Sequence, residues 1–383
     1  MTNFDLYLSG NKGLKKILVA LFPVFSLFLV TLQSYYFYQI GVSVFPVLGA
    51  GIIFSYGYLT RKQHLADSLF LFCFCCFLFF LYFSVFSFLG YSDWKKIIAS
   101  FVSFASLLGV VWVFNDSGNL IYRVLSVLIV VHLGFYFFQI AYWFLGGGYV
   151  DLLMPVTGEV QRYHSLKGAD FGGGLIPRFT GLFNEPGTFS SYLFSIIALR
   201  AIVGDKYDFL YYVSAVAIAI NFSLYGIIFS AVLFTLPMLK GKRFNVRAFL
   251  LVGVAASFFF VWFFPEINER LNSDYSGLDG RVDALEMLSH SETFLYGRSV
   301  LGLSDEAADA GILVTMLLHG GIIEVFIFFL VFLNVFRLQC LPGKIFMGAL
   351  LVSKIKVTYP FLWVVLALLF VSALNKQRAG HSS

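Results

Sequence analysis

Long runs of apolar residues constrain the fold of this chain more than any other feature. Runs of 14 to 28 residues recur between residues 17 and 375, and roughly 20 apolar residues suffice to cross the hydrocarbon core of a bilayer. Charged residues make up only 12% of the chain, against about 25% in a typical globular protein. This leaves too little polar surface for a water-soluble fold, and it excludes a soluble enzyme or a free regulatory domain.

We therefore predict an all-α polytopic integral membrane protein with about twelve transmembrane helices. The predicted helices cover residues 17–36, 40–59, 67–89, 97–114, 120–145, 187–203, 207–220, 222–239, 247–264, 309–336, 344–357 and 359–375. The segments 207–220 and 344–357 are short, so a broken or re-entrant helix is an alternative at both places. The first run lacks a small-residue cleavage site, and we do not expect a cleavable signal.

The placement of charges predicts the orientation of the chain. With the N-terminus in the cytoplasm, 16 of the 26 lysines and arginines lie inside, and about 15 of the 21 acidic residues lie outside. The strongest indication is the short, very basic connection KGKRFNVR at 240–247. We expect both termini to be cytoplasmic. Because the positive charge lies mainly in short connections, the net charge of +5 does not indicate a nucleic-acid partner.

Two long polar segments then face the outside, and they divide the chain into five parts. The parts are 1–145 with the first five helices, 146–186 as the first long periplasmic loop, 187–264 with helices six to nine, 265–308 as the second long periplasmic loop, and 309–383 with the last three helices and a cytoplasmic tail. Long connections between spans are usually functional or disordered. The mixed aromatic, apolar and charged composition of these two favours function.

The first long segment carries a candidate anion-binding group. Glycine triplets at Gly146–Gly148 and Gly172–Gly174 bracket much of it; they suit either a lid that bends at both ends or two simple helix breaks. Arg178 and Glu185 lie just before the next predicted span. The planar guanidinium of arginine matches phosphate oxygens bidentately, although an arginine at this depth also serves as a headgroup anchor.

The second long segment adds two more arginines. Apolar residues at helical spacing predict a helix from Asp279 onward, with Arg281 in its first turn, where free backbone N–H groups favour anions. A solvated amphipathic helix is the alternative. Arg298 follows in a turn. Both long segments carry more acids than bases, so an anion site must be a focused cluster of arginines, which Lys354 and Lys356 could join.

Three ionisable residues near or within the tenth predicted span are further candidates. Asp309 lies at the start of this span, where the helix dipole favours an acid and where a general base is also conceivable. His319 and Glu324 lie within it. Ionisable groups in a membrane are costly and often functional, but a hydrogen bond to a neighbouring helix explains His319 equally well and is favoured for Glu324. The four cysteines have no metal-ligand or redox spacing, so no metal site is predicted.

Several stretches together resemble a known family. RFTGLFNEPGTFSSYL at 178–193 resembles the Arg-x-x-Gly-x-Phe-x-Glu-Pro signature of the Wzy-type O-antigen and exopolysaccharide polymerases, in the O-antigen polymerase–ligase superfamily. GR at 280–281 with YGRS at 296–299 resembles the second outer loop of that group. DAGILVTMLLHGGIIEVFIFFLVF at 309–332 is similar to its next span, and INFSLYGIIFSAVL at 220–233 to its polar break between spans. The resemblance covers roughly residues 145–375.

This resemblance implies a glycosyltransferase at the periplasmic face of the bacterial inner membrane. Such an enzyme transfers the growing glycan from undecaprenyl pyrophosphate onto the incoming lipid-linked repeat unit, without a known cofactor. A chain-length-regulating co-polymerase is an implied partner. The outer-loop arginines of the family are thought to hold the pyrophosphate, and by motif match that role falls on Arg178 and Arg281. A second description of the family has ten residues between an arginine and a glycine in the outer loops. Arg162 and Gly173 fit this spacing, whereas the corresponding residue after Arg281 is Glu292.

The chemistry also needs a group to position the acceptor hydroxyl and accept its proton. Related O-antigen ligases carry a histidine before the corresponding span, where this chain has Asp309; we expect Asp309 to be the base, with Glu185 as the alternative. An O-antigen ligase, which shares the donor but uses lipid A–core as acceptor, is the nearest alternative function. A lipid-linked oligosaccharide transporter or flippase would need more charged residues deep in the spans and two pseudo-symmetric halves. A structural membrane protein would not need two long outer loops with arginines.

Overall fold

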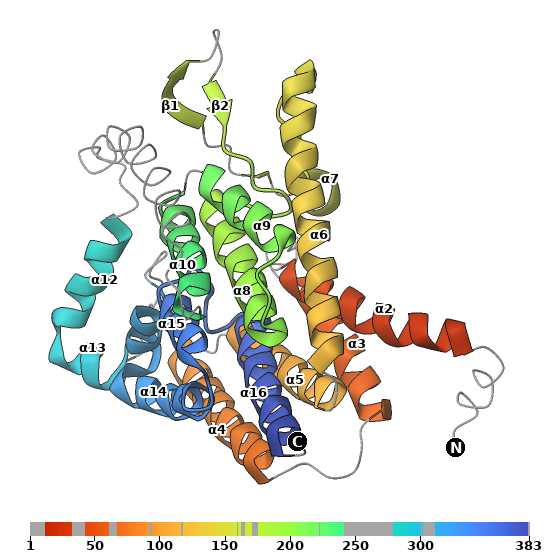
Figure 1. Ribbon diagram of the computed structural model, residues 1–383. Helices are drawn as coiled ribbons and strands as arrows, with labels where there is room; N and C mark the ends of the chain where they lie inside the picture. The colour runs from red at the N-terminus through yellow and green to blue at the C-terminus, as the bar shows by residue number, and fades with distance from the viewer. Residues whose placement is uncertain are drawn as a thin grey trace.

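The computed structural model describes residues 12–32, 43–60, 67–91, 94–115, 118–158, 160–161, 165–170, 175–221, 223–240, 279–299, 301 and 311–381. These residues form helices and one small antiparallel hairpin (Figure 1). The elements are α2 (Lys12–Thr31), α3 (Val44–Thr60), α4 (Asp67–Tyr91), α5 (Trp94–Phe114), α6 (Gly118–Tyr142), the π-helical turn η1 (Trp143–Gly147), α7 (Met154–Thr157), β1 (Ser165–Asp170), β2 (Leu175–Pro177), α8 (Pro186–Gly204), α9 (Phe209–Ile220), α10 (Leu224–Lys240), α12 (Asp279–Ser289), α13 (Ser291–Tyr296), α14 (Ile312–Phe336), α15 (Leu341–Leu351) and α16 (Pro360–His381).

The predicted helical membrane architecture is confirmed, while the count of twelve spans stays a prediction. Among the described residues, six helices are long and apolar enough to cross a membrane, and they are Ser68–Phe88, Trp94–Phe114, Gly118–Gly147, Pro186–Gly204, Ile312–Phe336 and Pro360–Arg378. Five shorter apolar helices of 10–17 residues cover the other predicted spans, except the one at 247–264, which lies outside the described residues. α9 and α15 have 12 and 11 residues. At 1.5 Å per residue neither reaches across about 30 Å of hydrocarbon.

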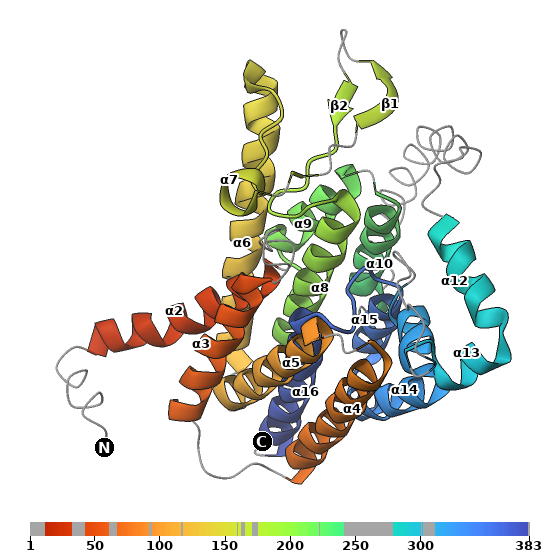
Figure 2. The ribbon, with the colours of Figure 1, turned by 180° about the vertical axis from the view of Figure 1, so that it is seen from behind.

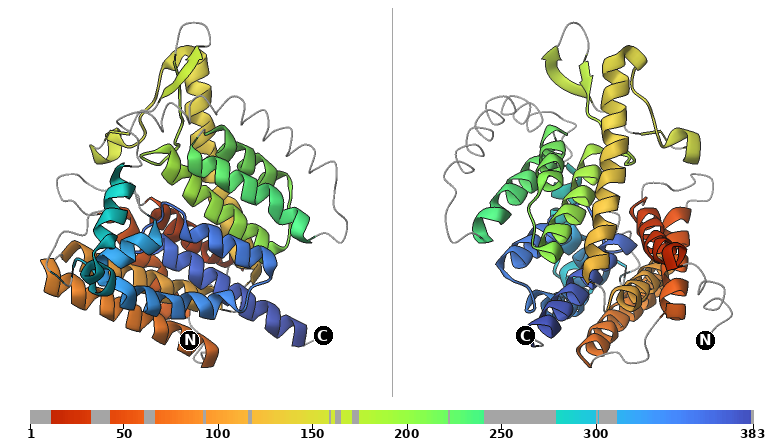
Figure 3. Two further views of the ribbon diagram at one scale, coloured as in Figure 1. Left: turned by 90° about the vertical axis from the view of Figure 1, so that its left-hand side faces the viewer. Right: turned by 45° about the vertical axis from the view of Figure 1, so that its right-hand side comes forward.

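The helices form a bundle with two distinct ends. α8 to α10 and α14 to α16 run side by side in the left view of Figure 3, and α4 and α5 cross in front of α16 when the bundle is seen from behind (Figure 2). We call the end where η1 finishes and α8, α14 and α16 begin the loop face. We call the opposite end, where α6 begins and α8 and α16 finish, the basic face. α6 extends along the bundle to the neighbourhood of the β1–β2 hairpin (Figure 1).

Glycines let the N-terminal helices pack at backbone distance. A Cβ added to Gly109 of α5 would lie 2.7 Å from the backbone of Ile53 in α3, and one added to Gly57 would lie 2.9 Å from the carbonyl of Gly109. A Cβ on Gly49 would lie 2.6 Å from the carbonyl oxygen of Ser26 in α2. Because lipid offers no hydrophobic drive for helix association, such close backbone contact is a usual basis of packing in membranes.

α8 and α16 form the centre of the bundle. In the most apolar 18-residue stretch of each helix, 83% is buried inside the protein. Aromatic rings fill the contact: Tyr192 of α8 stacks on Phe361 of α16 at 4.4 Å, and Phe72 of α4 stacks on Phe370 at 4.3 Å. Stacked aromatic pairs add about 0.5–1.5 kcal/mol beyond area burial. The start of α8, which carries part of the motif at 178–193, therefore leads directly into the most deeply buried part of the bundle.

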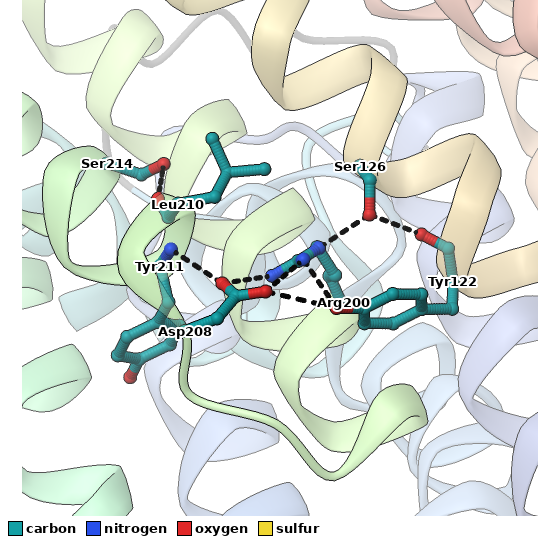
Figure 4. Close-up of polar contacts among 7 residues, drawn as sticks. All are labelled: Tyr122, Ser126, Arg200, Asp208, Leu210, Tyr211 and Ser214. Carbon is teal, nitrogen blue, oxygen red and sulfur yellow. Dashed lines mark hydrogen bonds and ion pairs between the residues drawn. The ribbon is translucent and has the colours of Figure 1, made fainter.

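A buried arginine links three helices at the basic face (Figure 4). Arg200 of α8 is 4% exposed and binds Asp208 with two hydrogen bonds, of 2.9 and 2.6 Å. Its Nε also donates to Ser126 of α6 at 2.7 Å, and Tyr122 donates to Asp208 at 3.1 Å. Asp208 in turn caps α9 by accepting from the backbone N–H of Tyr211. The bidentate pair neutralises a charge that would be costly to bury alone.

Because Asp208 is paired with Arg200, we expect the stability of the folded protein to fall in acid. Hydrogen bonds from Arg200 lower the pKa of Asp208 from 3.8 to about 2, so the stabilisation is complete above about pH 4 and is lost as the pH falls towards 2. Because Asp208 is 39% exposed, solvent weakens the pair, and we expect Asp208→Asn to cost only about 1–2 kcal/mol at pH 7. Thermal unfolding in detergent between pH 7 and 2.5 measures both effects.

The matched control is Asp205→Asn, three residues away. Asp205 is exposed and has a left-handed backbone with φ 56°, a conformation that Asn adopts readily. This control should keep the wild-type acid dependence, whereas Asp208→Asn should flatten it. An unchanged pH profile for Asp208→Asn contradicts the assignment.

Candidate functional site

Two buried glutamines hold the connection before α8 against α6. Gln161 shares its amide protons among Thr180 Oγ1 and the carbonyls of Gly181 and Phe183, at 2.8–3.1 Å. Gln139 of α6 donates to Gln161 Oε1 at 3.0 Å and accepts from the backbone N–H groups of Thr180 and Gly181 at 3.2 and 2.7 Å. Both glutamines are at most 1% exposed. The network satisfies backbone groups that are buried away from water, and so fixes residues 180–183.

The same network orders the chain after α6. Asp151 accepts hydrogen bonds from the backbone N–H groups of Leu153, Met154 and Gln161 at 2.7–3.0 Å. Gln161 Oε1 also accepts from the backbone of Leu152 at 3.1 Å. These bonds hold residues 151–154 against residues 178–185, which precede α8 and which we call the motif connection. This part of the first long segment therefore has a defined structure.

Glycines allow the turns of this connection. Gly146 and Gly148, at the end of α6 and η1, have φ values of 83° and 76°, in the left-handed region that favours glycine. The first predicted glycine bend is therefore present, while Gly172–Gly174 lies outside the described residues. Gly181 has φ 59° and lies close to α6, since an added Cβ would be 3.4 Å from the backbone nitrogen of Tyr136.

An ion pair lies at the first turn of α8. Glu185 immediately precedes Pro186, the first helical residue, where the fixed φ of proline suits a helix start. Its side chain does not cap the helix. Instead, Glu185 Oε1 accepts from Lys354 Nζ at 2.8 Å and from Thr188 Oγ1 at 2.9 Å. The two charged side chains are 12% and 14% exposed, so the pair is partly withdrawn from water.

Lys354 is positioned by contacts with α8 and α10. Its backbone N–H, in the connection between α15 and α16, donates to Ser191 of α8 at 3.1 Å. Its aliphatic stem passes Gly187, where an added Cβ would lie 3.0 Å from two of its carbons. Its ammonium lies 5.7 Å from the ring centroid of Tyr225 in α10, within cation–π range. Two segments distant in sequence, around Glu185 and Lys354, thus meet at the loop face.

Arg178 belongs to the same connection as Glu185. It is 9% exposed, which is unusual for an arginine because this residue type is rarely buried without a partner. The backbone of the next residue, Phe179, is fixed by Asn221 at the end of α9, because the Phe179 carbonyl accepts from Asn221 Nδ2 at 3.1 Å. Arg178 and Glu185 therefore flank a stretch of backbone, residues 180–183, that the two glutamines fix.

His319 and Glu324 form a second buried polar group, at a kink in α14. Gly320 and Gly321 interrupt the helix, with φ/ψ of −124°/15° and 67°/−160°. His319 Nδ1 lies 2.6 Å from Glu324 Oε2 across this kink, and Nε2 lies 3.0 Å from Ser87 Oγ in α4. Both ring nitrogens are thus engaged in protein contacts. This favours a structural bond between α14 and α4 for His319 over direct substrate contact.

The kink also receives the end of the second long segment. The backbone N–H groups of Arg298 and Ser299 donate to the carbonyls of Leu318 and His319 at 2.6 and 3.2 Å. A regular helix would satisfy these carbonyls internally, so the interruption at Gly320 creates the docking point. Gly297 allows the approach, because an added Cβ would meet the carbonyl of His319 at 2.3 Å. Arg298 lies in a turn, as predicted.

The remaining predicted site residues are less closely placed. Lys356 is exposed, two residues beyond Lys354. α12 begins at Asp279, so the predicted helix is confirmed and Arg281 lies in its first turn; only its backbone is described. Arg162 and Asp309 lie outside the described residues. The structure therefore brings Glu185 and Lys354 together at one end of α8, with Arg178 earlier on the same connection.

Sequence reasoning missed the residues that hold this site in place. Gln139 is a polar residue in the middle of an apolar run, and an amide buried at membrane depth must find partners; this signal was available. Gln161, Ser87 and Tyr225 carry no comparable signal, because their roles depend on contacts between distant segments. Among the residues that the structure describes, no three His, Cys, Asp or Glu side chains are grouped to hold a metal ion.

Comparison with family models, with characterised proteins and with solved structures finds no match to this chain.

The glutamine network predicts that Gln161 controls the order of the first long segment. Gln161→Met keeps the side-chain volume but removes every side-chain hydrogen bond of this hub. We expect limited proteolysis of the detergent-solubilised protein to cut residues 149–184 at least about tenfold faster, as expected for a loss of more than about 1.4 kcal/mol of local stability.

Val160→Ala is the matched control. Val160 precedes Gln161 and is 64% exposed, so its truncation should leave the cleavage rate unchanged. Equal cleavage of wild type and Gln161→Met would show that the network does not order the segment.

Proposed function

We propose that this protein is a membrane glycosyltransferase that polymerises undecaprenyl-pyrophosphate-linked oligosaccharide repeat units into O-antigen or a related surface polysaccharide. The observation that carries the proposal is the ion pair of Glu185 with Lys354 at the start of α8, on the same connection as the buried Arg178. There a buried arginine, a carboxylate and an ammonium lie on or against one fixed connection. The family resemblance of residues 178–186 supplies the reaction, and the contacts supply a physical basis for it.

The proposal includes a finer topology. The six long helices, the five shorter ones and the span predicted at 247–264 together make twelve. Both termini are cytoplasmic, and the loop face is periplasmic in a bacterial inner membrane. The concentration of basic residues near the basic face supports this orientation, because positive charge is retained on the cytoplasmic side. The partners are the lipid bilayer, the lipid-linked glycan as donor and acceptor, and a chain-length-regulating co-polymerase.

In the proposed reaction, a hydroxyl oxygen of the incoming repeat unit attacks the anomeric carbon of the growing glycan. The bond from that carbon to the pyrophosphate oxygen breaks, and undecaprenyl pyrophosphate leaves with both bonding electrons. Arg178 and Arg281 neutralise the negative charge that develops on the leaving group. Arg298, Lys354 and Arg162 are further candidate cations for the same role. The hydroxyl proton passes to a carboxylate, Asp309 or Glu185.

The ion pair bears on the role of Glu185. Lys354 and Thr188 both donate to the same carboxylate oxygen, Oε1, and these bonds fix the orientation of the side chain. A fixed carboxylate near a lipid pyrophosphate can position an acceptor hydroxyl, and the neighbouring ammonium can contact phosphate when the substrate enters. The proposed site is therefore preorganised before substrate binds.

Surface polysaccharide from a strain lacking this gene tests the function. Complementation with wild type should restore a ladder of chain lengths on gels, whereas Arg178→Ala and Arg281→Ala at equal expression should lower polymer yield by at least about a hundredfold, as for other lost transition-state donors. Polymer made without this gene contradicts the proposal. Accumulation of lipid-linked polymer that never reaches the core indicates a ligase instead.

A charge exchange separates a catalytic from a structural role of Glu185. Glu185→Gln and Lys354→Met each remove one member of the pair, and each should reduce polymer yield. If Glu185 acts on substrate, the exchange Glu185→Lys with Lys354→Glu restores thermal stability in detergent but not the ladder. Recovery of the ladder by the exchanged pair would reduce the pair to a structural contact.

A further inference from the structure

A second polar site lies at the basic face, opposite the motif connection. The ends of α6, α8 and α16 surround an open pocket of about 530 Å³, within the usual range for small-molecule sites. Its lining includes Gly118, Asn119, Tyr122, Lys206, Lys376 and Arg378. None of these residues contributes to the proposed polymerase site.

The pocket is lined by three cations and, among the residues described, by no carboxylate. Lys206, Lys376 and Arg378 are exposed to it from two different segments. Asp205, which lies in the chain between the lining residues Gly204 and Lys206, is exposed and offsets at most one of these three positive charges. The acid of the wall network, Asp208, is held by two hydrogen bonds from Arg200. Its charge is therefore neutralised within the wall of the pocket (Figure 4), and the pocket keeps a positive potential.

The cations are positioned by the protein. Lys376 donates to the carbonyl of Ile202 in the last turn of α8 at 2.7 Å, which offsets the partial negative charge of that helix end and leaves two ammonium protons for a ligand. Lys206 lies 5.9 Å from the ring centroid of Tyr122. Arg378 Nη1 lies 3.5 Å from the backbone and side-chain oxygens of Asn115.

The start of α6 adds backbone donors to the same space. Gly118 and Asn119, the first two residues of this 25-residue helix, line the pocket. The first turn of a helix has N–H groups without partners inside the helix and a partial positive charge, and both favour an anion such as phosphate. Helix dipole and side-chain cations thus act on one volume.

The position of the pocket at the ends of spanning helices indicates the source of its ligand. Three of the helices that are long enough to cross a membrane, Gly118–Gly147, Pro186–Gly204 and Pro360–Arg378, have one end at this pocket. The ends of spanning helices lie at the level of the lipid headgroups. Basic pockets between transmembrane helices are suited to anionic lipid headgroups.

We propose that this pocket binds a phosphate group, supplied by an anionic phospholipid headgroup of the surrounding leaflet. Lys206, Lys376 and Arg378 contact the phosphate oxygens, and the first N–H groups of α6 complete the site. The bound lipid joins α6, α8 and α16 at the end opposite the proposed reaction. The inference does not depend on the polymerase function.

Thermal unfolding of the full chain in a non-ionic detergent tests this site. We expect short-chain phosphatidylglycerol to raise the melting temperature in a saturable manner, at concentrations where phosphatidylcholine has no effect. Lys206→Ala and Arg378→Ala should each raise the apparent Kd about fivefold or more. The conservative Arg378→Lys should retain most of the affinity, which guards against misreading a folding defect.

Arg123→Ala provides the matched control. Arg123 is an exposed cation on α6, next to Tyr122, but it does not line the pocket, so its removal should leave the apparent Kd unchanged. If inorganic phosphate reproduces the full shift at similar concentrations, the site binds phosphate from a soluble source and the lipid assignment is wrong. An equal response to phosphatidylcholine, or equal weakening by Arg123→Ala, overturns the site itself.

Discussion

The hydrogen bonds of Gln139 and Gln161 determine where the motif connection lies. Residues 179–183 are buried away from water, so this irregular segment is stable only if side chains satisfy its backbone groups. The two amides do so for Thr180, Gly181 and Phe183. Glu185 follows this stretch and immediately precedes α8. Because α8 is buried in the centre of the bundle, the connection has a fixed position relative to the rest of the fold.

The same principle explains how the second long segment is held. Gly320 and Gly321 break α14 and leave the carbonyls of Leu318 and His319 to be satisfied by Arg298 and Ser299. The first connection is thus attached to the bundle through side-chain amides, and the second through backbone hydrogen bonds at the kink of α14. In the proposed enzyme this arrangement holds arginines of two distant segments on a rigid frame, as preorganised charge stabilisation requires.

Much of the fold could be predicted from the sequence, because apolar runs of spanning length report directly on a membrane environment. The short helix at 207–220, the first-turn position of Arg281 and the turn at Arg298 were also readable from local patterns. The helix predicted at 344–357 is instead Leu341–Leu351, and residues 352–357 belong to the connection that carries Lys354. Local patterns could not reveal that Lys354 meets Glu185, since 169 residues separate them. The buried pair of Arg200 with Asp208 was hidden for a different reason, because each residue alone resembles an ordinary interfacial charge.

The most direct measurement of the central claim is a reaction with the purified full chain in detergent or lipid vesicles. Undecaprenyl-pyrophosphate-linked repeat units from the source cell are the only substrate, and mass spectrometry follows the glycans. The account predicts chains of two, three and more repeat units, with one undecaprenyl pyrophosphate released for each bond formed. Repeat units that remain single in the presence of folded protein would contradict it.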